Sequence, residues 1–328
     1  MTQPLARPLS RRFCRLLRRT QSVVILLIAL LPAMRAHAED TVLRVGYLRT
    51  QGYIADFPLA GVKIPGVKLE IVPLETGNDV LEAVSAHAVD VGETGEVQPI
   101  FAQSGKRPIK VIASTGPQPA ATAILVLEQS PVKQVEDLRG KRVSFVRGTN
   151  THWLVIQSLA RAGLRQSDIR PALLGPADTL SALKLGHIDA ATLTAPNIEI
   201  AQHQGARVLV DGHGLVNSSI YYLATTDTIA SKREAIGRFV AALSDHLRWI
   251  QAHKNERATW LAPKYGIPPE LVLDASGVMA PTLAPVGDDA LVSYTQQVAD
   301  AFADQKLIPA RIDVREEFDG SFDKDIRR

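Results

Sequence analysis

Short runs of apolar, often β-branched residues alternate with segments of helical periodicity along most of the chain. Apolar runs that predict strands occupy 42–47, 67–72, 89–92, 109–113, 122–127, 188–193, 207–210 and 219–225. Helical patterns occupy 79–88, 97–104, 152–162 and 178–185, and later 232–253, 258–265, 269–276 and 288–304. This alternation is typical of an α/β sheet protein. No low-complexity linker divides the chain, so we predict two α/β units joined by crossing strands.

The first 38 residues have a different composition. Six arginines lie between Arg7 and Arg19, an apolar run follows at 23–31, and Ala36-His37-Ala38 supplies small residues before a cleavage site. This pattern predicts a secretory signal peptide cleaved after Ala38, hence an exported protein. Nine apolar residues are too few to cross about 30 Å of hydrocarbon as a helix. Arginine pairs at 11–12 and 18–19 leave the choice between the Sec and twin-arginine routes open.

Cleavage would change the net charge of the chain. The full sequence carries a formal charge of +3, but residues 1–38 hold seven arginines and no acid. The mature chain would keep 30 basic and 34 acidic residues, a net charge of −4. That charge and an aromatic content of 5% argue against a nucleic-acid partner.

Motifs for catalysis, cofactors and metals are not found in the sequence. The single cysteine, Cys14, leaves with the signal peptide, so neither a disulfide nor a thiol site is expected. No phosphate-binding loop, dinucleotide-binding glycine pattern or nucleophile elbow occurs. No two histidines have H-x-H or H-x-x-x-H spacing. We therefore predict no catalytic residue, no cofactor and no metal site.

Three predicted strand-to-helix junctions carry small polar residues. They are Thr94-Gly95-Glu96, then Gly148-Thr149-Asn150-Thr151-His152, then Thr194 with Asn197. Backbone N–H groups at a helix start have no intrahelical partner and lie at the positive end of the helix dipole, so uncharged donors could hold an anion there. Simple helix capping by the same side chains is the alternative. We expect the Glu96 side chain to cap the helix or turn to solvent while its backbone N–H makes the contact.

The chain resembles periplasmic aliphatic sulfonate-binding proteins of ABC importers, within the sulfonate, taurine and nitrate group. The likeness covers essentially the whole mature chain. The segments that carry it are 43–47, 92–103, 130–132 with 135–143, 147–164, 176–178, 186–190, 281–282 and 307–310.

The resemblance implies a bilobed periplasmic-binding-protein fold of type II, with the ligand in a cleft between two α/β lobes. Lobe 1 would comprise 41–122 plus 220–328 and lobe 2 would comprise 123–219, joined by two crossing strands. Ligand contacts are implied at the helix starts 94–96 and 148–152. Arg49 and Thr50, which follow the first strand, and Tyr221, in the second crossing, complete the predicted ligand-binding residues.

One departure from the resemblance concerns the strand end near residue 193. Relatives commonly carry an aromatic residue, an acid and a proline there, whereas this chain has Thr194-Ala195-Pro196-Asn197. The pocket is therefore expected to be wider or more polar on that side. A bulkier sulfonate or a sulfate ester is therefore an alternative to an aliphatic sulfonate.

The function implied by the resemblance is capture of a small organosulfur anion by a monomer. The partners would be an inner-membrane ABC permease and its ATPase subunit. An enzyme on the same bilobed fold, such as one that makes a pyrimidine precursor of thiamine, is the alternative, and the missing catalytic motifs argue against it. A ligand-sensing module for a membrane kinase is a third hypothesis and would require a separate output partner.

Overall fold

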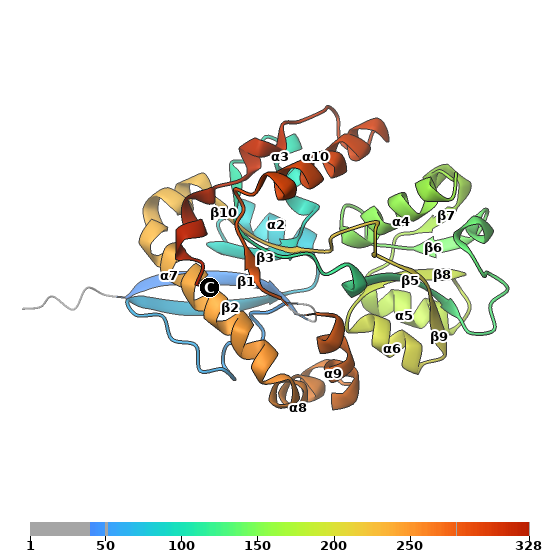
Figure 1. Ribbon diagram of the computed structural model, residues 1–328, viewed down its shortest axis with the longest axis horizontal. Helices are drawn as coiled ribbons and strands as arrows, with labels where there is room; N and C mark the ends of the chain where they lie inside the picture. Colours follow the sequence, from blue (N-terminus) through green and yellow to red (C-terminus); the bar gives the residue numbers. More distant parts are fainter. Residues whose placement is uncertain (1–39, 50–51, 280, 328) are drawn as a thin grey trace, which may run out of the picture. The chain divides into compact units, whose positions relative to one another are not determined.

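A computed structural model describes residues 40–49, 52–279 and 281–327. The predicted signal peptide, 1–38, and the candidate ligand residue Thr50 lie outside the described residues. Within the described ranges, no helix is both long and apolar enough to cross a bilayer. From Thr41 onward the chain forms one unit by its internal contacts, organised around two sheets (Figure 1).

Sheet A contains six strands drawn from both ends of the chain. Their order is β11 (Leu283–Ala284), β4 (Ile109–Thr115), β10 (Ile220–Thr225), β3 (Val91–Gly95), β1 (Thr41–Leu48) and β2 (Val67–Leu74). Strand β1 runs parallel to β2 and β3, whereas β10 runs antiparallel to β3 and β4. All six residues of β10 are buried. The chain therefore returns from the second sheet to complete the centre of the first.

Sheet B contains five strands from the middle of the chain. Their order is β7 (Arg170–Ala172), β6 (Arg142–Ser144), β8 (Ala190–Thr194), β5 (Thr122–Leu127) and β9 (Ala206–Asp211). Strand β5 is antiparallel to both neighbours, and β6 is parallel to β7 and β8. Because side chains alternate along β5, Ile124 and Val126 lie in one apolar cluster while Ala123 and Leu125 lie in another.

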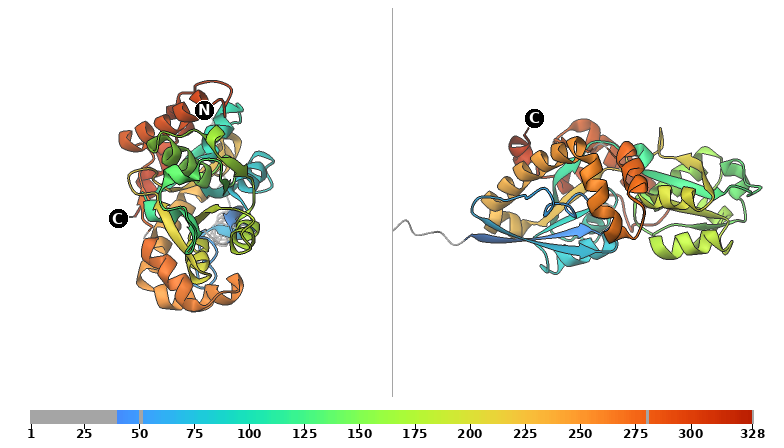
Figure 2. Two further views of the ribbon diagram at one scale, coloured as in Figure 1. Left: turned by 90° about the vertical axis from the view of Figure 1, so that its right-hand side faces the viewer. Right: turned by 90° about the horizontal axis from the view of Figure 1, so that it is seen from below.

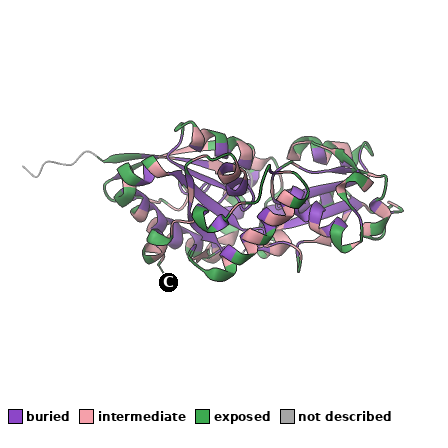
Figure 3. Ribbon diagram, turned by 90° about the horizontal axis from the view of Figure 1, so that it is seen from above, coloured by how far each residue is buried: buried purple, intermediate pink, exposed green. Residues whose placement is uncertain are grey.

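Helices cover the faces of both sheets (Figures 1 and 2). Helices α2 (Gly77–Ser85) and α7 (Thr226–Ala252) pack on sheet A, and α4 (Asn150–Arg161) packs on sheet B opposite α5 (Pro176–Lys184) and α6 (Asn197–His203). The remaining α-helices are α3 (Gln98–Ser104), α8 (Lys254–Tyr265), α9 (Pro269–Val278) and α10 (Asp289–Asp304). The strands of both sheets are largely buried, and the outer helix faces are exposed (Figure 3).

Local sequence explains where several helices begin. Thr76 accepts a hydrogen bond from the Asp79 N–H while the Asp79 carboxylate accepts one from the Thr76 N–H, which is a capping box before α2. Asp288 caps α10 by accepting from the Ala290 N–H. By contrast, no side chain accepts a capping hydrogen bond at the start of α4.

The two segments that cross between the sheets lie side by side. One runs from β4 to β5 through a 3₁₀ turn at Pro119–Ala121, and the other runs from β9 to β10. The Gln118 N–H donates to the Asn217 carbonyl at 2.7 Å, and the Ser218 hydroxyl donates to Thr122 Oγ1 at 2.9 Å. These bonds hold the two crossings as a pair.

The predicted α/β class with two sheets is confirmed, and most strands and helices begin within a few residues of their predicted bounds. The junction at 92–96 differs from the prediction in where the strand ends. Strand β3 extends through Thr94 and Gly95, three residues beyond the predicted 89–92, while α3 begins at Gln98, one residue after its predicted start. The reason is tertiary, because both residues pair with β10, a strand more than a hundred residues away.

Candidate functional site

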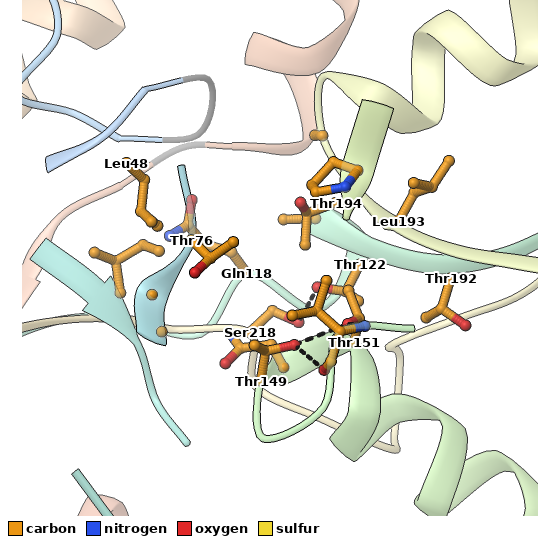
Figure 4. Close-up of a pocket in the computed structure, with 18 of the residues that line it drawn as sticks. Leu48, Thr76, Gln118, Thr122, Thr149, Thr151, Thr192, Leu193, Thr194 and Ser218 are labelled. Carbon is orange, nitrogen blue, oxygen red and sulfur yellow. Dashed lines mark hydrogen bonds between the residues drawn. The ribbon is translucent and has the colours of Figure 1, made fainter. Parts of the chain in front are cut away.

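One pocket lies where the crossing segments meet the ends of strands from both sheets. It encloses about 830 Å³ of space between atoms, part of it open to solvent. Figure 4 shows many of its residues. The lining comprises Leu48, Tyr53, Glu75, Thr76, Gly77, Gly95, Gln98, Gln118, Ala121, Thr122, Val146, Thr149, Asn150, Thr151, Pro176, Thr179, Thr192, Leu193, Thr194, Ala195, Ser218, Ile220 and Met279.

Two helix starts, one on each sheet, contribute to this pocket. Thr76 and Gly77 begin α2 on sheet A, and Thr149, Asn150 and Thr151 begin α4 on sheet B. The first hydrogen bond of α4 runs from the Trp153 N–H to the Thr149 carbonyl. The N–H groups before Trp153 therefore have no partner inside the helix. Both helix dipoles favour a negative charge at their N-terminal ends.

The loop before α4 is held in shape by its own side chains. The Thr149 hydroxyl donates to the Val146 carbonyl at 2.8 Å and lies 2.8 Å from Thr151 Oγ1, which accepts from the Val146 N–H at 3.1 Å. Gly148 adopts a φ of +74°, and a Cβ there would also lie 3.1 Å from the Phe101 ring. These bonds fix the shape of the loop, which lowers the entropic cost of binding a ligand there.

Asn150 connects the helix start of α4 to sheet A. Its Oδ1 accepts from the Glu96 N–H at 3.1 Å, and its Nδ2 donates to the Ser219 carbonyl at 3.4 Å. A Cβ at position 95 would lie 2.4 Å from Asn150 Oδ1, so only glycine permits this approach. The segments 94–96 and 148–151, predicted to face one ligand, are therefore in direct contact.

The expectation for the Glu96 side chain was wrong. The carboxylate neither caps α3 nor faces solvent but is buried, with 1% of the residue exposed. It accepts from the Ser218 N–H at 3.1 Å, the Ser219 N–H at 2.9 Å and the Tyr294 hydroxyl at 2.8 Å. Desolvation raises the pKa of Glu96 to about 7 although these three donors oppose the shift. Its contacts give it the role of fixing the second crossing segment beside the pocket.

The predicted site residues divide into two groups in the structure. Gly95, Thr149, Asn150, Thr151 and Thr194 line the pocket. The others among the described residues do not line it: Arg49, Thr94, Glu96, Gly148, His152, Asn197 and Tyr221.

The members of the second group make other contacts. The Thr94 hydroxyl donates to the Gly77 carbonyl at 3.3 Å, and the Tyr221 hydroxyl lies 3.0 Å from Thr295 Oγ1. His152 Nδ1 accepts from the Gly148 N–H at 3.2 Å while its ring stacks on Phe145, and burial lowers its pKa. Asn197 is buried at the first turn of α6. Arg49 is half-exposed and forms an ion pair with Glu75 at 2.6 Å.

Several lining residues were not predicted. Thr76 and Gly77 belong to a T-x-x-D capping box at 76–79, a signal that could have revealed a further helix start. Gln118, Thr122 and Ser218 lie in the crossing segments, where no local pattern indicates that the chain passes a pocket. Gln98 and Thr192 are buried polar residues, and Gln98 Oε1 and Thr192 Oγ1 have no hydrogen-bond partner.

A loop after β1 supplies the aromatic part of the wall. The Tyr53 hydroxyl donates to Gln118 Oε1 at 2.6 Å, and the Tyr53 N–H donates to Glu93 Oε1 at 2.8 Å. The same loop is fixed by Asp56, which contacts His246 Nε2 at 2.7 Å and the Arg257 guanidinium. This buried cluster sets the position of Tyr53 against the pocket.

The pocket offers hydrogen-bond donors without positive charge. No lysine or arginine is among its lining residues, and the one charged lining residue, Glu75, is exposed and paired with Arg49. Over the described ranges, no cluster of three or more histidine, cysteine, aspartate or glutamate side chains is arranged to hold a metal ion. Hydroxyl, amide and backbone N–H groups are therefore the means by which this site can bind an anion.

Comparison with known proteins places the chain among solute-binding proteins. A family described as NMT1/THI5-like matches residues 63–257. A curated relative in Escherichia coli (strain K12), named as an aliphatic sulfonates-binding protein, is 31% identical over 288 residues, or 87% of this chain and 90% of the relative.

Solved structures agree with that result. The crystal structure of the periplasmic aliphatic sulphonate binding protein SsuA from Escherichia coli is similar, with a TM-score of 0.77 and 31% identity over 84% of this chain and 91% of that chain. The alkanesulfonate-binding protein SsuA from Xanthomonas axonopodis pv. citri, bound to MOPS, has a TM-score of 0.80 and 26% identity over 85% and 98%. These matches confirm the predicted bilobed fold class.

The same fold also occurs in an enzyme. The desulfurization enzyme DSZB has a TM-score of 0.62 at 13% identity, over 87% of this chain and 99% of that chain. Identity this low shows a shared fold alone, and a fold does not determine a function.

Proposed function

Because the chain belongs to the NMT1/THI5-like family, we propose that it is a periplasmic solute-binding protein that captures a small organosulfur anion, an alkane sulfonate or a related sulfonate or sulfate ester. The anion is delivered to an inner-membrane ABC permease with its ATPase subunit. The observation that carries the proposal is the pocket at which the starts of α2 and α4 meet, lined by uncharged donors. The similar Escherichia coli and Xanthomonas proteins support the choice of a sulfonate.

The chemistry of the anion fits this wall. A sulfonate is ionised at every physiological pH and presents three acceptor oxygens in a tetrahedral arrangement. The first-turn N–H groups of α2 and α4 are donors to the pocket from the two sheets, while the hydroxyls of Thr149 and Thr151 fix the loop that presents the α4 donors. Several donors directed at a single headgroup bind it through charge-assisted hydrogen bonds, which are stronger than neutral ones.

Lobe closure completes the binding shell in this proposal. Lobe 1 corresponds to 41–122 plus 220–328 and lobe 2 to 123–219, with the paired crossing segments as the hinge. Contacts already link the two sides, since Asn78 Nδ2 donates to the Arg147 carbonyl at 3.2 Å and Asn150 Oδ1 accepts from the Glu96 N–H. A ligand that contacts both helix starts binds the closed arrangement more tightly and shifts the population towards it.

A thermal-shift screen of the purified protein tests the function. The compounds are alkane sulfonates, taurine, aryl sulfonates, sulfate esters, sulfate and nitrate. A bound anion raises Tm with increasing concentration because it stabilises only the folded state. If none of the organosulfur compounds raises Tm, the proposed function is wrong.

A matched pair of variants locates the site. Thr149→Ala removes the hydroxyl that orders the loop before α4, and we expect at least about tenfold weaker binding by calorimetry. Thr259→Ala removes an exposed hydroxyl that bonds only its own helix, so it should leave binding unchanged. Incubating each organosulfur compound with the protein and analysing it by mass spectrometry tests the enzyme alternative, which requires conversion to product.

A further inference from the structure

One pocket wall, formed by β8 and its neighbours, is unusually rich in threonine. Thr192 and Thr194 are two residues apart on β8 and so share one face of sheet B, and Thr122 on β5 pairs directly with Thr194. All three line the pocket, as does Thr179 from α5. Apolar β-branched residues would fill the same volume without polar groups, so the hydroxyls call for a chemical explanation.

Two of these threonines, Thr122 and Thr179, have hydrogen-bond partners, whereas Thr192 has none. Thr122 Oγ1 accepts from the Ser218 hydroxyl at 2.9 Å, and Thr179 Oγ1 lies 2.6 Å from Ser144 Oγ. Thr192 is 3% exposed, yet its Oγ1 is buried without a hydrogen-bond partner. An unpaired buried hydroxyl destabilises the protein unless something in the pocket pairs with it.

A second unpaired group approaches the pocket from sheet A. Gln98 is 1% exposed, and its Oε1 also lacks a partner. A Cβ at Gly77 would lie 2.6 Å from its Nε2, so the amide fits closely under the start of α2. The pocket thus contains a buried hydroxyl and a buried amide oxygen without partners, and a sulfonate with a purely alkyl chain, which carries acceptors only, cannot pair with the amide oxygen.

Thr192 lies apart from the starts of α2 and α4, which are proposed to bind the headgroup. In Figure 4 it lies on the far side of Thr122 and Thr151 from Thr76 and Leu48. Thr149 and Thr151 are already linked to each other and to the backbone of Val146. A ligand whose headgroup lies against the starts of α2 and α4 would extend its carbon chain along β8.

We propose that Thr192, supported by Thr194, binds a hydrogen-bonding substituent on the carbon chain of the captured anion. The pocket therefore selects organosulfur anions with a hydroxyl, ether or amine group over their purely alkyl counterparts. This inference rests on the proposed function, because it assumes that an organosulfur headgroup is bound. A hydroxylated chain pairs with Thr192 Oγ1, whereas an alkyl chain covers that hydroxyl and leaves it unpaired.

Calorimetry with two matched pairs of anions tests the selectivity. The pairs are 2-hydroxyethanesulfonate against ethanesulfonate and 3-hydroxypropane-1-sulfonate against propane-1-sulfonate. We expect the hydroxylated member of at least one pair to bind at least about tenfold more tightly. Equal affinity within both pairs would overturn the inference and leave the proposed function intact. Failure of all four anions to bind would overturn both.

Three variants then assign the selectivity to β8. Thr192→Val keeps the shape of the side chain but removes its hydroxyl, so it should weaken binding of the hydroxylated anion about tenfold and bind the alkyl anion at least as tightly as the wild type does. Thr192→Ser should retain the preference. Equal weakening of both members of a pair would mean that Thr192 contacts the headgroup, which contradicts the assignment. If Thr192→Val does not fold, Thr194→Val is measured instead. If that variant still prefers the hydroxylated anion as strongly as the wild type does, the β8 wall does not determine the selectivity.

Discussion

Gly77 and Gly95, which both line the pocket, leave room for polar side chains to approach the backbone closely. A Cβ at Gly77 would lie 2.5 Å from Thr94 Oγ1, and a Cβ at Gly95 would lie 2.4 Å from Asn150 Oδ1. Neither glycine has a positive φ, so each is required for space and not for backbone conformation. Real Cβ atoms do not approach a neighbouring oxygen this closely. A methyl group at either position therefore displaces a polar side chain from the site.

Replacing Gly95 with alanine tests this dependence. The added Cβ pushes Asn150 away from the Glu96 N–H, so we expect at least about tenfold weaker anion binding. Gly277→Ala is the matched control, because a Cβ there meets no atom within 4 Å, and alanine favours the α9 helix. Calorimetry and thermal melting of both variants give the comparison. Unchanged affinity in Gly95→Ala would show that the contact with Asn150 is not required.

Among the elements, α10 joins parts of the fold that are distant in sequence. Phe302 is fully buried, with ring centroids 5.5 Å from Phe101, 5.6 Å from His152 and 5.8 Å from Trp153. The Tyr294 hydroxyl accepts from Trp153 Nε1 and from the Asn217 N–H while it donates to Glu96. The helix therefore packs against α3, α4 and the second crossing segment together.

Truncating Phe302 measures the contribution of that packing. Phe302→Ala leaves a cavity among three aromatic rings, and we expect a loss of about 3–5 kcal/mol in the free energy of unfolding. Phe302→Leu keeps most of the volume and should cost less. Urea denaturation of both variants checks the order. A loss below about 1 kcal/mol in Phe302→Ala would show that α10 contributes little to stability.

At the level of elements, sequence periodicity predicted more of the fold than of the pocket. Strands and helices follow from local patterns, and the glycine and donors at 148–151 indicated the start of α4. The pairing of Thr94 and Gly95 with β10 could not be predicted, because their partners lie more than a hundred residues away. Thr122 and Ser218 could not be predicted as pocket residues for the same reason, because their contact joins segments that are distant in sequence. The burial of Glu96 depends on Tyr294, which no local pattern connects to it.

Among the described residues, three buried carboxyl groups with strongly raised pKa values link the stability of the whole molecule to pH. Burial raises the pKa of Glu93 and of Glu96 to about 7 and that of Glu317 to about 8, from an ordinary value of 4.5. The folded protein thus keeps these protons to a higher pH than the unfolded chain does. Their stabilising contribution is complete below about pH 4.5 and is lost as the pH rises through 7 and 8.

Glu317 is the clearest residue with which to test this linkage. Both of its carboxylate oxygens are buried and have no hydrogen-bond partner. Glu317→Gln cannot ionise, so it should flatten the fall in Tm between pH 5 and pH 8.5 and raise Tm at pH 8.5 by about 3 °C or more. The exposed neighbour Glu316, changed to glutamine, is the control and should leave the slope as it is. An identical slope in wild type and Glu317→Gln would contradict the linkage.

The position of α10 late in the chain also constrains the order of assembly. During synthesis, residues 289–304 emerge after both sheets, yet they supply the cover for Trp153 and the third hydrogen bond to Glu96. A nascent or truncated chain that stops before Asp289 would expose Phe101 and Trp153 and lack the Tyr294 contact. Such a fragment should be sensitive to proteases and prone to aggregation, so capture of a solute becomes possible only once nearly the entire polypeptide has been made.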